Sequence, residues 1–146
     1  MENVDLITIG AGLVLGMFYY SRTGWTCGGI IVPGILALYI SDPFAVVFSL
    51  VMGIVVSFLL VIPVRFFGLY GRQRIASAML IALLLKLVLV TFNWQGTIWL
   101  GWVVPGLVGS DIQRQGIIET ISGSLSVSIA SVMAVQFLSM LPGVFL

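Results

Sequence analysis

Residues 29–36 read GIIVPGIL and residues 101–108 read GWVVPGLV, so the chain states one apolar phrase twice. Both copies place a proline and a glycine inside a stretch that otherwise reads as a membrane helix. Proline removes a backbone donor, and glycine permits conformations that are closed to other residues. The copies begin at positions 29 and 101, an offset of 72 residues in a chain of 146. The sequence therefore predicts an internal repeat, with each half built around one broken segment.

The composition predicts an integral membrane protein. Hydrophobic residues make up 60% of the sequence and charged residues 8%, and the mean hydropathy is +1.23. A soluble domain carries about 25% charged residues, so this chain could not cover its surface in water. Its 17 glycines suit helices that pack by close approach. We predict an all-α fold in which residues 1–146 form a single membrane domain.

The residue inventory excludes several kinds of site. The sequence has no histidine and one cysteine, which argues against disulfide frameworks, zinc sites and Ser-His-Asp triads. It contains no phosphate-binding loop and no acidic metal cluster, and its net charge of +1 indicates no nucleic-acid partner. We therefore predict no catalytic residue, metal or cofactor in this chain. For Cys27 we favour a packing role over a reactive thiol.

Long apolar runs predict the other elements, and the 72-residue offset places those of the first half on those of the second. We read the first run as a retained helix, because Glu2 and Asp5 precede it and no cleavage site follows. In chain order the elements are helix 6–21, broken segment 25–40, helix 44–62, helix 75–92, broken segment 97–109 and helix 117–141. Repeat 1 covers about 5–62. A cytoplasmic linker covers 63–74, and repeat 2 covers about 75–141.

The broken segments decide the topology. If each crosses the membrane, each half has three crossings and the second half is inverted relative to the first. If each only dips in, the halves are parallel and Arg22 lies on the opposite face from Arg65, Arg72 and Arg74. The positive-inside rule favours crossing, because all arginines then face the cytoplasm. We predict six crossings, arranged three plus three inverted, with both termini outside.

Some residues of the spans are candidates for a transport path. Backbone groups freed at a break cannot face lipid, so they line a polar cavity or are satisfied by neighbouring helices. The breaks are thus either a substrate path or kinks that let the halves pack closely. A lysine inside a span indicates function unless it snorkels to the surface. The candidates are Val32, Pro33, Gly34, Lys86, Val104, Pro105 and Gly106.

The arginines form a second candidate set. They either fix only the orientation, or dock a partner or an anionic substrate that arginine can grip in bidentate fashion. We expect Asp111 and Glu119 to be their local counter-charges. The candidate residues for docking are Arg22, Arg65, Arg72, Arg74 and Arg114.

An ordered set of motifs extends over nearly the whole chain. It comprises RTG at 22–24, GIIVPG at 29–34, LYGR at 69–72, Lys86, VVPGL at 103–107 and IQRQG at 112–116. Val-Pro-Gly alone is a weak signal, but the ordered set is specific. It resembles the PgsC/CapC family, small membrane subunits of the bacterial poly-γ-glutamate synthase.

The resemblance implies a multi-pass subunit of the bacterial cytoplasmic membrane that serves capsule synthesis. A PgsB/CapB-like ligase would use ATP and a divalent metal, and a PgsA/CapA-like subunit would act on the outer side. The chain would anchor the ligase and assist elongation or export of the polymer, and a homo-oligomer is also allowed. The alternatives are a secondary transporter for a small anion and a purely structural membrane anchor.

Overall fold

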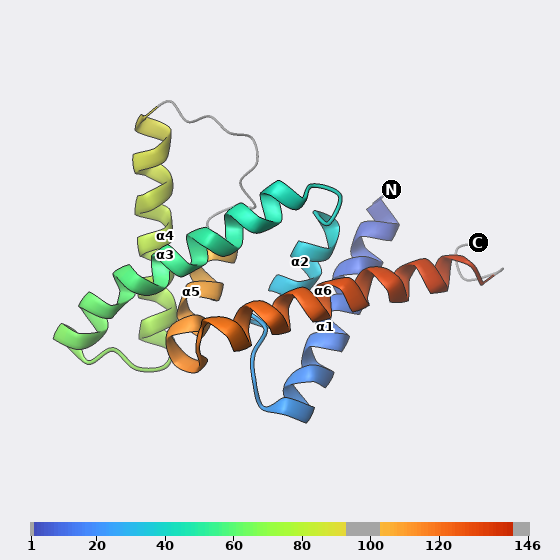
Figure 1. The fold of residues 1–146 in the computed structure, drawn as a ribbon, viewed down its shortest axis with the longest axis horizontal. Coiled ribbons are helices and arrows are strands. Elements are labelled where there is room, and N and C mark those ends of the chain that lie inside the picture. The colour runs from blue at the N-terminus through green and yellow to red at the C-terminus, as the bar shows by residue number, and fades with distance from the viewer. Residues whose placement is uncertain (1, 93–102, 142–146) are drawn as a thin grey trace.

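The fold is an assembly of helices, shown in Figure 1 as a computed structural model that describes residues 2–92 and 103–141. Within these two ranges the regular structure is entirely helical, which confirms the all-α prediction. The helices are α1 (Glu2–Thr23), α2 (Val32–Leu38), α3 (Pro43–Phe67), α4 (Arg72–Thr91), α5 (Val103–Gln115) and α6 (Ile117–Ser139).

Four of these helices, α1, α3, α4 and α6, are long and apolar enough to cross a membrane. The chain is therefore a helical membrane protein. Helix α2 has 7 residues and α5 has 13. At 1.5 Å per residue they extend about 10 and 20 Å, less than the hydrocarbon core of about 30 Å. Six crossings would require the segments before α2 and α5 to span part of the membrane together with these short helices. The count of six therefore stays a prediction.

The two halves repeat one pattern of contacts. Helix α1 packs on α2 and α6, and its equivalent α4 packs on α5 and α3. Helix α2 packs on α6, and its equivalent α5 packs on α3. In Figure 1, α1 and α4 run in opposite directions, and so do α3 and α6. Exchanging the halves therefore maps these packing contacts onto one another, as expected of an inverted repeat.

The linker between the halves is shorter than the predicted 63–74. Helix α3 continues through Pro63 to Phe67, and α4 begins at Arg72. A proline inside a membrane helix is tolerated where its surroundings satisfy the freed backbone groups. The helix ends instead at Gly68, whose left-handed conformation lets its N–H donate to the Val64 carbonyl at 3.0 Å.

The broken segments also differ from the prediction. Residues 24–31 are not helical, and α2 begins at Val32, so Pro33 lies in the first turn of a helix instead of interrupting one. Proline suits that position because the N–H it lacks has no partner there. Pro105 likewise lies in the first turn of α5. The start of the second broken segment, residues 97–102, lies outside the described residues.

A further difference concerns the expected polar turn at 111–115, which forms the last turns of α5. The main core joins α2, α3 and α5 through Val32, Leu36, Val46, Leu50, Val104, Val108 and Ile112. Val32 and Val104 come from the two copies of the repeated phrase, so the two halves share one core.

Candidate functional site

The glycines of the two Val-Pro-Gly sequences make equivalent contacts. A Cβ added at Gly34 would lie 3.0 Å from the carbonyl oxygen of Ile9 in α1. A Cβ added at Gly106 would lie 3.1 Å from the Cα of Met79 in α4. Each glycine thus lets a short helix lie against the backbone of the long helix before it. This supports the close-packing interpretation of the breaks.

The valines and prolines of the phrase are almost completely buried: Val32, Pro33, Val104 and Pro105. These side chains fill the space between helices, so their observed role is packing. Their predicted place in a transport path stays a prediction.

The loop at 24–31 is tied to the end of α5 by Gln115. The Oε1 atom of Gln115 accepts hydrogen bonds from the backbone N–H of Thr26 at 2.9 Å and from its hydroxyl at 3.2 Å. The Nε2 atom donates to the Thr26 carbonyl oxygen and to the hydroxyl of Thr120 in α6 at 3.0 Å. One glutamine therefore joins the loop, α5 and α6.

Two more side chains of α5 extend this connection. The Gly29 N–H donates to Oδ2 of Asp111 at 2.8 Å. A guanidinium N–H of Arg114 donates to the Thr26 hydroxyl at 3.1 Å. Hydrogen bonds that involve a charged group are stronger than neutral ones. We name these five residues the loop junction: Thr26, Gly29, Asp111, Arg114 and Gln115.

Glycine is required in this loop because its backbone adopts left-handed conformations. Gly28 has φ of 78° and Gly29 has φ of 88°, which other residues adopt only at a cost. The conformation of Gly29 directs its backbone N–H towards Asp111. The loop therefore follows a fixed path from α1 into α2.

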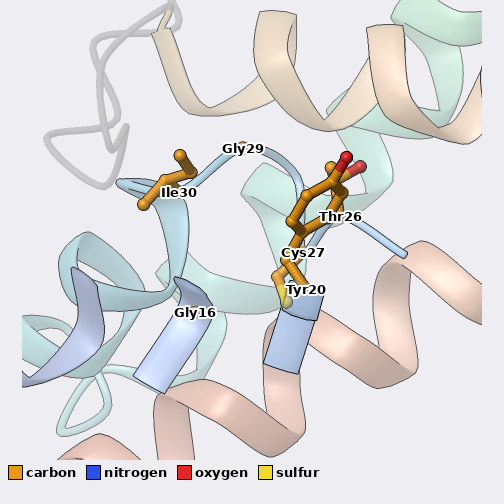
Figure 2. Close-up of a pocket in the computed structure, with 6 residues that line it drawn as sticks. All are labelled: Gly16, Tyr20, Thr26, Cys27, Gly29 and Ile30. Atoms are coloured by element: carbon orange, nitrogen blue, oxygen red, sulfur yellow. The ribbon is translucent and has the colours of Figure 1, made fainter. Parts of the chain in front are cut away.

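A small cavity of about 90 Å³ lies beneath the loop junction (Figure 2). Helix α1 contributes Gly16 and Tyr20, and the loop contributes the other wall. The residues that line this wall are Thr26, Cys27, Gly29 and Ile30. Cys27 is 2% exposed, in keeping with the predicted packing role. Pockets for small molecules have about 300–1,000 Å³, so this space is too small to hold a substrate.

Lys86 lies one helical turn beyond the buried Ala82 on α4, and it is itself half-buried. Within the part of the chain that the structure describes, its ammonium group has neither an ion pair nor a hydrogen bond. The choice between a functional lysine and a snorkelling one therefore stays open.

The arginines lie at helix ends that share one side of the molecule. These ends are the last turns of α1, α3 and α5 and the first turn of α4. All four ends lie towards the lower edge of Figure 1. Arg22, Arg65, Arg72, Arg74 and Arg114 therefore form one basic side, which we call the arginine side.

The expected counter-charges of the arginines do not pair with them. Asp111 accepts from Gly29, and the Glu119 carboxylate lies against Gly116 at the start of α6. No ion pair forms within residues 2–92 and 103–141. Asp111 thus holds the loop that precedes α2, and among the described residues neither acid neutralises the arginine side.

Within the loop junction, the sequence alone predicted a site role only for Arg114 and expected Asp111 to be a counter-charge, so it missed the junction roles of Thr26, Gly29, Asp111 and Gln115. Their signal was the polar run at 111–115 in a chain with only 8% charged residues. The run was read as a turn, so its partners 82 to 89 residues away were not sought.

Comparison with known proteins identifies the family. The family profile described as "Capsule biosynthesis CapC" matches residues 11–121. The "Capsule biosynthesis protein CapC" of Bacillus anthracis is 32% identical over 139 residues, which cover 88% of this chain and 91% of that protein. The "PGA biosynthesis protein CapC" of Bacillus subtilis (strain 168) is 28% identical over 136 residues, with the same coverage. No solved structure matches. The chain belongs to the CapC family of capsule biosynthesis proteins, as its ordered motifs indicated.

Proposed function

We propose that this chain is a membrane subunit of the bacterial machinery that makes capsular poly-γ-glutamate. The family match carries the proposal, because it includes both Val-Pro-Gly sequences and the whole loop junction. The four apolar helices, which are long enough to cross a membrane, support a place in a membrane, and we propose the cytoplasmic membrane. The described residues contain no group of three potential metal ligands, and activation of glutamate with ATP and a divalent metal is assigned to a separate ligase subunit.

The arginine side is the proposed docking site for that PgsB/CapB-like ligase. The end of α3 and its short connection to α4 lie on this side, and their aromatic residues are among the most exposed of the described residues. Phe66 is 83% exposed, Phe67 79% and Tyr70 82%. Arg65 and Arg72 flank them. Aromatic residues with arginine are enriched at the centres of protein interfaces, and an acidic partner surface would complete this one.

We further propose that the chain assists elongation or export of the polymer, together with a PgsA/CapA-like subunit on the outer side. Lys86 supports a polyanion path because it is a cation in a membrane helix without a counter-charge in the described residues. A pure membrane anchor is the second candidate function. The tight packing of both Val-Pro-Gly sequences favours it.

Purification of the chain from its native membrane tests the docking proposal. The wild-type chain should bring along a ligase-sized partner, and the double variant Arg72→Glu with Arg74→Glu should lose it. The charge-preserving pair Arg72→Lys with Arg74→Lys is the control and should retain much of the partner. A ligase that remains bound to the charge-reversed chain would place its docking site elsewhere. A wild-type chain that never brings a ligase along would contradict the proposed function itself.

A further inference from the structure

A groove of about 270 Å³ runs between α1 and α6. Its walls are almost entirely apolar, with Leu15, Phe18 and Tyr19 on α1 and Val127 and Ala130 on α6. Arg22 also lines the groove, in the last turn of α1. Both helices are candidate membrane spans, so the groove opens towards lipid along its length and ends at a cation.

Small side chains on α6 make the groove. A Cβ at Gly123 would lie 3.2 Å from the Tyr19 ring, so this glycine lets the tyrosine ring approach α6 closely. Ser126 and Ala130 leave space farther along. The 72-residue offset places Ile54 and Phe58 of α3 at the equivalent positions. These larger side chains occur only in the other half, so the groove is a feature of the α1–α6 pair and does not follow from the internal repeat.

Arg22 is positioned beside the groove by an aromatic contact. Its guanidinium carbon lies 5.5 Å from the centroid of the Phe18 ring, a distance at which a cation is attracted to the ring face. Phe18 lies one turn earlier on α1 and also lines the groove. Among the described residues, no carboxylate pairs with Arg22. The cation therefore remains available to an anion at the surface of the membrane.

We propose that this groove binds one anionic glycerophospholipid from the leaflet on the arginine side. An acyl chain would lie along Leu15, Phe18 and Val127, and the headgroup phosphate would accept hydrogen bonds from the Arg22 guanidinium. Arginine matches phosphate geometry with two parallel donors, and basic pockets between membrane helices bind anionic headgroups. The proposal is independent of the ligase and of the polymer.

Native mass spectrometry of the purified chain tests the site. The detergent-solubilised protein is mixed with equal amounts of phosphatidylglycerol and phosphatidylcholine, and the fraction of each bound lipid is measured. The wild-type chain should retain phosphatidylglycerol about fivefold better, as expected for one arginine near an anionic headgroup. Arg22→Gln should remove this preference, and Arg22→Lys should keep part of it. Arg72→Gln, which removes an exposed arginine outside the groove, should leave the preference unchanged.

A second variant tests the apolar part of the groove. Ala130→Phe introduces the side chain that α3 carries at the equivalent position, and it should lower the retention of both lipids. Circular dichroism confirms that each variant remains helical. Equal retention of the two lipids by the wild-type chain, a preference that persists in Arg22→Gln, or unchanged retention in Ala130→Phe would each overturn the proposal.

Discussion

Gln115 pairs with both backbone polar groups of Thr26, its N–H and its carbonyl oxygen, although the two residues are 89 positions apart. Its Oε1 accepts from the Thr26 N–H at 2.9 Å, and its Nε2 donates to the Thr26 carbonyl oxygen. The side-chain amide thus pairs with the backbone as a neighbouring strand would. Through this contact the end of α5, in the second half, fixes the loop that leads into α2 of the first half.

Gln115→Ala should release this loop and expose Cys27. The variant loses several hydrogen bonds to Thr26, each worth about 1 kcal/mol, so open states should become about tenfold or more populated. Cys27 is the one cysteine of the chain and is buried. The rate at which a maleimide labels it therefore reports opening directly.

Gln136→Ala is the matched control for this experiment. Gln136 is exposed on α6, and its side chain makes no hydrogen bond to the described residues, while its backbone carbonyl accepts one from the Ser139 hydroxyl. Labelling of Cys27 should proceed at the wild-type rate in this variant. Equal labelling of Gln115→Ala and the wild-type chain would show that the loop does not depend on the glutamine.

Gly12→Ala should destabilise the chain. A Cβ at Gly12 would collide with the backbone of Gly34, where α2 crosses α1, and backbone cannot move aside as a flexible side chain can. Overpacking of this kind costs about 1–3 kcal/mol. The loss should appear as a lower midpoint of thermal unfolding in detergent.

Gly10→Ala, on the same helix, provides the comparison. A Cβ there meets nothing within 4 Å, and alanine favours a helix by up to about 1 kcal/mol over glycine. This variant should unfold at or above the wild-type temperature. If both variants unfold at the same temperature, the α1–α2 crossing is looser than described.

Accessibility labelling should place the arginine side in the cytoplasm. In a Cys27→Ser background, Arg22→Cys and Arg72→Cys should both react with an impermeant maleimide only from the cytoplasmic face. Asp42→Cys, at the turn before α3, should react only from outside, because in the six-crossing topology one crossing separates it from Arg22 and another, α3, separates it from Arg72. Labelling of Arg22→Cys and Arg72→Cys from opposite faces would rule out the inverted topology.

Lys86→Met should reduce the yield of exported polymer several-fold while the complex still assembles. Methionine keeps the apolar length of the side chain and removes the charge, so packing against α4's neighbours is largely preserved. Lys86→Arg keeps the charge and should retain much of the yield. If Lys86→Met gives the wild-type polymer yield, this lysine does not line the polymer path, and the snorkelling interpretation holds.

Much of the fold was predictable because a membrane imposes simple rules. Apolar runs of sufficient length gave the long helices, and the repeated phrase gave the two halves. The helix ends were less predictable. Pro63 was read as a stop and lies inside α3, since a proline breaks one hydrogen bond and the continuing helix outweighs that loss.

The sequence by itself determined a helical membrane protein with a repeated design and a basic side, because composition, periodicity and charge act locally along the chain. Only the tertiary structure decided what the repeated phrase and the polar run do. Gly34 and Gly106 admit the backbones of α1 and α4, and Asp111 and Gln115 hold a loop 82 to 89 residues away. Contacts of this kind depend on where helices cross, and crossing points are set by packing between distant segments.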